Sequence, residues 1–137
     1  MTSVRHMTSV RLATLQDLPA MQAWRDWHHA KHESIEAGEC HVAIKDGLPV
    51  GYGILNRGFF ERAWIALLFV PEPHRRQGVG NALLEHMEYA CGEKRIWTST
   101  ELPNLPMQSL LKKRGYMLTG VVENLQKNPE LFYFKDL

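Results

Sequence analysis

The sequence predicts one mixed α/β domain with about seven strands and about four helices. The chain has 137 residues, of which 45% are hydrophobic, and this is enough for a single core but too little for two domains. Apolar runs of strand length alternate along it with segments of helical period. In the middle, the apolar run at 64–70 leads through a glycine-containing loop into a helical pattern that begins at Gly78.

The N-terminus carries a short duplication. The letters MTSVR at 1–5 recur at 7–11, and His6 separates the two copies. A second start methionine preceded by histidine is typical of a cloning junction. Residues 1–6 are therefore interpreted as an extension left by cloning, and residues 7–137 as the single domain.

The N-terminal part predicts a strand at 9–14 followed by two helices. Thr14, with Asp17 three residues later, resembles a capping box that opens the first helix. Apolar residues at helical spacing predict the buried face of this helix: Leu18, Met21, Trp24 and Trp27. The second helix is expected over about 29–37, because Gly38 follows as a stop signal.

The middle of the chain predicts three strands. Two segments of alternating polarity, 40–45 and 50–57, flank Asp46-Gly47, which is the strongest short hairpin signal in the chain. The run WIALLFV at 64–70 is continuously apolar, so it predicts a central strand that is buried on both faces.

The second half predicts two helices. From Gly78 onward, a stripe at helical spacing ends at Gly92 and consists of Val79, Leu83, Met87 and Cys91. Asn104 as N-cap and Gly115 as stop delimit a shorter helix. Three further strands are expected at 95–100, about 116–123 and about 131–136.

Charge and composition exclude several classes of partner. The 16 basic residues nearly balance the 15 acidic ones, so no global field favours nucleic acid or a membrane surface. The longest apolar runs fall far below the ~20 residues of a membrane span, and the N-terminus lacks a secretory apolar region, so a cytoplasmic protein is expected. Cys40 and Cys91 match neither a disulfide framework nor a zinc signature and are interpreted as small buried residues; no metal is expected.

The junction VPEPHRRQGVGN at 70–81 gathers positive charge at a helix start. The first amides of a helix lack intrahelical partners, and the aligned peptide dipoles add partial positive charge there. Gly78 and Gly80 allow an anion to approach the backbone, and Arg75 and Arg76 add charge beside it. The loop lacks both the Gly-Lys-Ser/Thr of a P-loop and the third glycine of a dinucleotide fingerprint. A local anion site is one interpretation, and an ordinary glycine-containing loop is the alternative.

The letters RRQGVG, from Arg75 to Gly80, resemble the Q/R-x-x-G-x-G/A signature of the GNAT superfamily of acetyl-CoA-dependent N-acetyltransferases. RLATLQDLPAM looks like the first strand and helix of that family, and NLPMQSLLKKRGY looks like its late helix, so the resemblance extends over about 9–136. It implies a mixed, mostly antiparallel sheet that splays between its fourth and fifth strands. It also implies that acetyl-CoA is the cosubstrate, and that its acetyl group passes to a primary amine of a small-molecule or amino-acid-like acceptor.

The resemblance assigns a coenzyme site position by position. It implies that the acetyl oxyanion is stabilised by the amide of Leu68, and that backbone groups of Phe69 and Val70 are unpaired and contact the pantetheine arm. Asn104 matches an asparagine that commonly contacts this arm, although a helix N-cap explains it equally well. The loop that holds the pyrophosphate comprises Arg75, Arg76, Gln77, Gly78, Val79, Gly80 and Asn81.

Two positions depart from the family pattern. The tyrosine that acts as the acid in many members corresponds to Leu111, and an early-strand glutamate corresponds to Trp64. Ser109 or water is therefore the candidate for assisting thiolate departure, and Glu101 is the first candidate for the base, with a water-mediated base as the alternative. Two other functions stay open: acetylation of a protein side chain or N-terminus, and, because of these departures, a coenzyme A-binding module without catalysis.

The acceptor wall is expected in WRDWHHAKHESIEAGECH, residues 24–41. Trp24, Trp27 and Glu33 would give aromatic and acidic groups for a cationic amine, whereas the alternative places both tryptophans in the core. The hairpin loop NRGFFERAW supplies exposed aromatic residues for an acceptor rim or a homodimer contact, and exposed strand edges also favour a homodimer.

Overall fold

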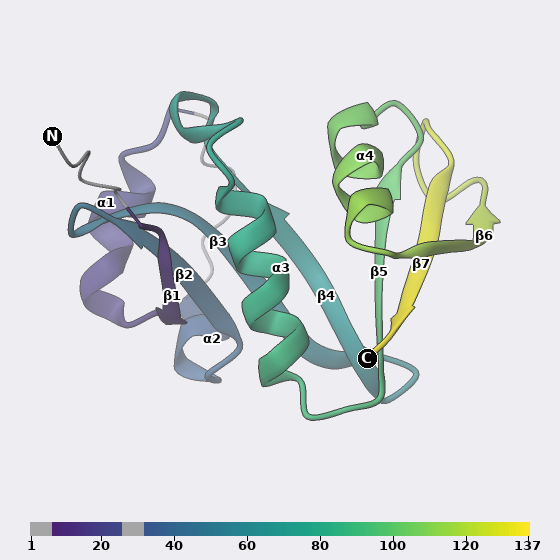
Figure 1. The fold of residues 1–137 in the computed structure, drawn as a ribbon, viewed down its shortest axis with the longest axis horizontal. Helices are drawn as coiled ribbons and strands as arrows, with labels where there is room; N and C mark the ends of the chain where they lie inside the picture. The colour runs from purple at the N-terminus through teal and green to yellow at the C-terminus, as the bar shows by residue number, and fades with distance from the viewer. Residues whose placement is uncertain (1–6, 26–31) are drawn as a thin grey trace, which may run out of the picture. The chain divides into compact units, whose positions relative to one another are not determined.

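The computed structural model describes residues 7–25 and 32–137 (Figure 1). The described strands are β1 (Ser9–Leu12), β2 (Cys40–Lys45), β3 (Leu48–Phe59), β4 (Arg62–Phe69), β5 (Arg95–Glu101), β6 (Met117–Val122) and β7 (Glu130–Asp136). The α-helices are α1 (Leu18–Gln22), α2 (His32–Glu36), α3 (Val79–Ala90) and α4 (Leu105–Lys113), and short 3-10 helices η1 (Leu15–Asp17) and η2 (Glu72–His74) precede α1 and α3. The mixed α/β fold predicted from the sequence is confirmed.

The strands form one sheet in the order β1-β2-β3-β4-β5-β7-β6. The pairs β1/β2, β2/β3, β5/β7 and β6/β7 are antiparallel, whereas β4 and β5 are parallel. The parallel ladder has two register pairs, Trp64 with Trp97 and Ile65 with Thr98, although β4 continues to Phe69. Thr98 Oγ1 donates a 3.0 Å hydrogen bond to the carbonyl of Ile65. A ladder this short agrees with the predicted splay between the fourth and fifth strands.

The chain divides into two compact units. The first comprises the described residues among 1–54 and 67–87, and the second comprises residues 55–66 and 88–137. The strands β3 and β4 and the helix α3 therefore each contribute residues to both units.

The core of the first unit joins α1 and α2 to β2 and β3. Its buried residues are Ala13, Leu18, Met21, Ile35, Cys40, Val42, Tyr52 and Ile54, and Trp24, Ile44, Leu67 and Phe69 pack against them. Leu18 and Met21 confirm the predicted buried face of the first helix, but α1 ends at Gln22. Trp27 and residues 29–31, where the second helix was expected to start, lie outside the described residues.

Two glycines of β3 allow α3 to lie close to the strand. A Cβ on Gly51 would lie 2.8 Å from Cγ1 of Val79, and a Cβ on Gly53 would lie 2.7 Å from Cε of Met87. Real Cβ atoms do not tolerate such distances, because the interior is close-packed. Gly51 and Gly53 therefore set how closely α3 approaches the sheet.

Three predictions about local environment are wrong. The strand β3 continues to Phe59, so the expected loop at 56–64 reduces to a turn at Phe60 and Glu61. The run at 64–70 is not buried on both faces, because Ala66 is exposed and the residues after it are only half-buried. Cys91 lies beyond the end of α3 and is partly exposed, whereas Cys40 is fully buried.

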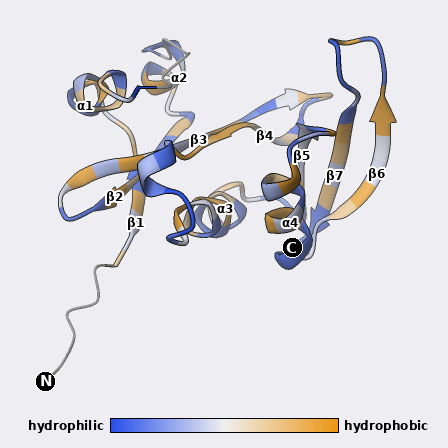
Figure 2. Ribbon diagram, turned by 90° about the horizontal axis from the view of Figure 1, so that it is seen from above, coloured by the Kyte–Doolittle hydropathy of each residue, from blue (hydrophilic) through white to orange (hydrophobic). Residues whose placement is uncertain are grey.

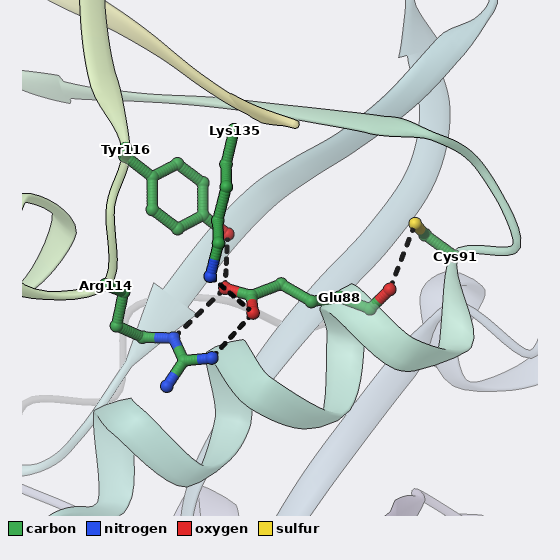
Figure 3. Close-up of polar contacts among 5 residues, drawn as sticks. All are labelled: Glu88, Cys91, Arg114, Tyr116 and Lys135. Carbon is green, nitrogen blue, oxygen red and sulfur yellow. Dashed lines mark hydrogen bonds and ion pairs between the residues drawn. The ribbon is translucent and has the colours of Figure 1, made fainter. Parts of the chain in front are cut away.

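A carboxylate in the second unit connects α3 to the segment after α4 and to β7 (Figure 3). Glu88 accepts hydrogen bonds from Nη2 of Arg114 at 2.6 Å, Nζ of Lys135 at 3.0 Å and Oη of Tyr116 at 2.9 Å. Burial raises the pKa of the Glu88 carboxyl, but the hydrogen bonds from Arg114, Lys135 and Tyr116 outweigh burial, so the pKa is lowered. The charged form of Glu88 is therefore the stable form in the folded protein.

Two histidines of the first unit lie against each other between β2 and α3. His41 Nδ1 and His86 Nε2 are 3.1 Å apart. Burial and the charge of His86 lower the pKa of His41 to about 4, and burial lowers the pKa of His86. The pair is therefore held in its neutral form in the folded protein at neutral pH.

Replacing Glu88 is expected to destabilise the protein strongly. Glu88→Gln leaves Arg114 and Lys135 without their carboxylate, and breaking a buried ion pair costs about 3–5 kcal/mol. Urea unfolding at pH 7 measures the change. Glu85→Gln, an exposed change on the same helix, should stay within about 0.5 kcal/mol. A loss below about 1 kcal/mol for Glu88→Gln would show that the network does not stabilise the fold.

The histidine pair is expected to make the protein sensitive to acid. The unfolded state takes up a proton near pH 6.5, whereas folded His41 does so only near 4, so its contribution is fully present above pH 6.5 and is lost as pH falls toward 4. The loss amounts to about 3 kcal/mol. Urea unfolding between pH 7.5 and pH 4.5 checks this: His41→Phe should flatten the pH dependence relative to the wild type. An unchanged slope in His41→Phe would exclude this assignment.

Candidate active site

The predicted anion site lies at the start of α3. The carbonyl of Gly78 accepts a 3.0 Å hydrogen bond from the amide of Ala82, so Gly78 is the residue from which the helix begins. Its φ is +80°, a value that glycine adopts without strain, and no atom lies within 4 Å of the position of a Cβ. The conformation, not crowding, therefore requires glycine here. The amides of Val79 and Gly80 belong to the first turn, where a helix presents partial positive charge.

Side chains of the loop hold its shape. Arg75 Nε donates a 2.9 Å hydrogen bond to the carbonyl of Val70. Gln77 accepts from Lys45 Nζ at 3.2 Å and donates to the carbonyl of Pro73 at 3.3 Å. Unpaired backbone groups were expected at Val70, but its carbonyl is paired, because it accepts this hydrogen bond from Arg75. The loop is tied both to the end of β4 and to β2.

Phe69, at the end of β4, belongs to an aromatic cluster of the first unit. Its ring centroid lies 5.8 Å from that of Trp24 and 5.7 Å from that of Tyr52, and Trp24 and Tyr52 are stacked at 6.3 Å. Leu68, Phe69 and Val70 are all half-buried. The structure therefore brings Trp24 to the strand predicted to hold the acetyl group, and also packs it against the core. Glu33, on α2, is exposed.

A second carboxylate lies beside Glu101 in the second unit. Glu101 is exposed at the end of β5, and the antiparallel register places it directly opposite Glu130 of β7. Glu130 accepts hydrogen bonds from Ser99 Oγ at 2.6 Å and from Gln126 Nε2 at 3.2 Å. Directly opposed residues share one face of a sheet, so two carboxylates occur together there. Glu130 was not predicted as a site residue, because its alternation with Phe132 and Phe134 marks a face of the strand without giving the register.

Three residues singled out in the sequence lie on α4 or at its N-cap: Asn104, Ser109 and Leu111. Asn104 is its N-cap, because its Oδ1 accepts a 3.2 Å hydrogen bond from the amide of Met107, as predicted. Ser109 is exposed on this helix. Leu111, at the position of the family tyrosine, is fully buried. The tyrosine hydroxyl of other family members is thus absent here, and an apolar side chain in the core takes its place.

Among residues 7–25 and 32–137, no three His, Cys, Asp or Glu side chains are grouped so that they would hold a metal ion. Within the same residues, no helix has the length and apolar character that crossing a membrane requires.

Comparisons with known proteins agree on one family. The sequence matches the family model for the acetyltransferase (GNAT) family over residues 6–116. The structure matches a GNAT-family acetyltransferase from Bacillus cereus at 25% identity and a TM-score of 0.87, covering 95% of this chain and 97% of that one. Arabidopsis thaliana Naa50, in complex with the bisubstrate analogue CoA-Ac-MVNAL, matches at 21% identity and a TM-score of 0.72, covering 95% and 99%. The Escherichia coli ribosomal-protein-S18-alanine N-acetyltransferase matches at 18% identity and a TM-score of 0.74, covering 95% and 94%. Among curated proteins, none matches the sequence.

The family model covers well over half of the residues, and the chain therefore belongs to the GNAT family of acetyltransferases. The resemblance seen in RRQGVG is confirmed by this match. The protein is an acyltransferase of the N-acetyltransferase type. The position of the signature fits this class, since Arg75–Gly80 follow β4 and η2 and lead into the first turn of α3.

Two substitutions at Asn104 are expected to separate its role as a cap from a role in binding. Aspartate is as good an N-cap as asparagine, whereas alanine costs about 1 kcal/mol. Asn104→Asp should therefore keep the free energy of unfolding, and Asn104→Ala should lower it, in thermal or urea unfolding. If the amide also contacts the coenzyme, both variants raise the KM for acetyl-CoA. A KM that rises only in the alanine variant would assign Asn104 to capping alone.

Proposed function

We propose that the protein transfers the acetyl group of acetyl-CoA to a primary amine of a small-molecule or amino-acid-like acceptor, by direct attack of the amine on the thioester. The observation that carries this proposal is the loop from Arg75 to Asn81, a full family signature at the start of a twelve-residue helix. The Naa50 complex with a coenzyme A bisubstrate analogue supports acetyl-CoA as the cosubstrate.

In this proposal, the signature loop binds the pyrophosphate of the coenzyme. The first amides of α3 and the helix dipole attract the two phosphates. Arg76, exposed beside them, adds positive charge. Arg75 acts mainly by holding the loop against Val70, through the hydrogen bond described above.

The end of β4 positions the thioester. Backbone groups of Phe69 and the amide of Val70 contact the pantetheine arm, and the amide of Leu68 donates to the oxyanion that forms when the amine attacks. One well-placed donor of this kind contributes about 2.7–4 kcal/mol to transition-state stabilisation. Trp24, stacked within the cluster that contains Phe69, forms part of the acceptor wall.

Proton transfer uses carboxylates and water instead of a tyrosine. An alkyl ammonium has a pKa of about 10 and has to lose a proton before it attacks. Glu101 is the proposed base, and Glu130, fixed by Ser99 on the same face, supports the binding of a cationic amine. Ser109 or water assists the departing thiolate. Glu33 and Trp27 complete the proposed acceptor site.

A second candidate function is acetylation of a protein N-terminus. The likeness to the ribosomal-protein-S18-alanine N-acetyltransferase, which by its name modifies a protein, favours this candidate. A third is a coenzyme A-binding module without catalysis, which the replacement of the family tyrosine by Leu111 favours.

Isothermal titration with acetyl-CoA tests the coenzyme site. The wild-type protein is expected to bind, and Gly80→Glu should weaken binding by at least about tenfold, because a carboxylate and a side chain then occupy the phosphate position. Tyr89→Glu adds the same charge at an exposed position on the same helix and should leave the affinity within about twofold. No binding by the folded wild type would overturn the proposal.

Thiol release then identifies the acceptor class. Release with small amines supports the proposed function, and release only with peptides supports the second candidate. Binding without release on either panel supports the non-catalytic module. Glu101→Gln, which keeps size but removes the charge, should lower kcat with little change in coenzyme affinity if Glu101 is the base.

A further inference from the structure

The face of β2 that packs against α3 ends in a lysine. His41, Ala43 and Lys45 alternate along this strand, so their side chains share one face. On this face, His41 lies against His86 of α3, and Ala43 is fully buried. Lys45 is the last residue of β2 and is only half-buried. Its ammonium therefore lies where the covered face of the strand reaches solvent.

A tight turn fixes the backbone of Lys45. Asp46 and Gly47 have φ values of 53° and 77°, the left-handed values of a two-residue hairpin turn, and Lys45 pairs with the first residue of β3 across it. The strand β3 in turn lies close to the start of α3, because a Cβ on Gly51 would overlap Val79. The hairpin and the signature loop therefore belong to one packed arrangement within the first unit.

Gln77 connects Lys45 to the signature loop. Its Oε1 accepts a 3.2 Å hydrogen bond from Nζ of Lys45, and its Nε2 donates one of 3.3 Å to the carbonyl of Pro73. Arg76 and Gly78, on either side of Gln77, have φ values of 62° and 80°. The left-handed conformation is rare for arginine and has to be held by the surrounding contacts. The two hydrogen bonds of Gln77 thus hold the loop where its backbone conformation is least favourable.

Lys45 keeps an uncompensated positive charge beside this loop. Among the residues that the structure describes, Lys45 forms no ion pair, and its hydrogen-bond partner is the neutral amide of Gln77. An ammonium has three N–H donors, of which this contact uses one. The other donors can therefore bind an anion at the loop while Gln77 stays in place.

The charges of the hairpin and of the loop show what Lys45 adds. In the segments 45–48 and 70–81, the charged side chains are Lys45, Arg75, Arg76, Asp46 and Glu72, and His74 is counted as neutral. Three cations against two carboxylates leave one positive charge, and without Lys45 the two signs would cancel. Figure 2 shows the loop before α3 in the blue of hydrophilic residues. Lys45 therefore gives these two segments their net attraction for an anion.

We propose that Lys45 is a phosphate ligand of the coenzyme site, and that its ammonium binds a phosphate group of acetyl-CoA while Gln77 holds it beside the signature loop. The inference rests on the proposed function, because it assumes that the loop binds the coenzyme. A lysine ammonium is a compact point charge that suits phosphate oxygens. Lys45 lies 32 positions before Gln77, so the signature does not include it.

Isothermal titration with acetyl-CoA at low ionic strength tests this role. Lys45→Met keeps an unbranched side chain and removes the charge, and it should raise the dissociation constant at least about fivefold, or about 1 kcal/mol. Lys45→Arg keeps the charge and should stay within about threefold of the wild type. Lys94→Met is the matched control, because it removes the same charge from an exposed lysine just before β5 and should stay within about twofold.

Salt separates a contact with phosphate from a structural role. Dissolved ions screen a charge pair, so the difference in affinity between the wild type and Lys45→Met should fall below about twofold at about 0.5 M KCl. If Lys45 only held Gln77 and the loop in place, the difference would be the same at every salt concentration. Circular dichroism and thermal unfolding establish that each variant is folded.

Two forms of the coenzyme identify the phosphate group. Acetyl-CoA carries a 3′-phosphate and a pyrophosphate, whereas its 3′-dephospho form carries the pyrophosphate alone. A loss of affinity in Lys45→Met that disappears with the dephospho form assigns Lys45 to the 3′-phosphate. An equal loss with both forms assigns it to the pyrophosphate. Either result supports the proposal.

Four results would overturn it. A wild type that binds acetyl-CoA no more tightly than Lys45→Met excludes this inference alone and leaves the proposed function intact. Equal weakening by Lys94→Met assigns the effect to net charge. A loss that salt does not change assigns Lys45 to holding the loop. A folded wild type that does not bind acetyl-CoA overturns the proposed function itself, and this inference with it.

Discussion

The close packing of α3 on β3 is the constraint on which the proposed coenzyme site depends. The signature loop ends where α3 begins, so the position of its amides follows the position of the helix. Gly51 and Gly53 set that position, because a side chain at either glycine would overlap Val79 or Met87. Val79 is itself part of the signature, and a residue of β3 thus determines where an amide proposed to bind phosphate lies.

The loop itself combines a conformational requirement with side-chain contacts. Gly78 supplies a left-handed backbone conformation, and Arg75 and Gln77 hold the loop to the end of β4 and to β2. The sequence signature by itself predicts only ligand binding for these residues. In this chain, two of them also fix the geometry in which the backbone amides are presented.

Local chemistry explains which parts of the fold were predictable. Asp46 and Gly47 adopt φ values of 53° and 77°, as an Asp-Gly hairpin turn requires, and the pair marked the hairpin in the sequence. Asn104 marked a helix start, because its side chain caps the first turn of α4. The turn at Phe60 and Glu61 has similar left-handed values but carries no glycine or asparagine, so no residue type marked it and the strand before it was predicted too short. Within the site, Glu130 was missed because its place opposite Glu101 depends on the register of strands that are far apart along the chain.

The stacking of Trp24 on Tyr52 and Phe69 has a practical consequence. Indole emission depends on the polarity and mobility of its surroundings, and this indole contacts a residue of the strand proposed to hold the acetyl group. The chain therefore contains an intrinsic fluorophore beside its proposed reaction centre. Occupancy of that centre can be followed optically in the unlabelled protein, once the contributions of the other three tryptophans, Trp27, Trp64 and Trp97, are removed by substitution.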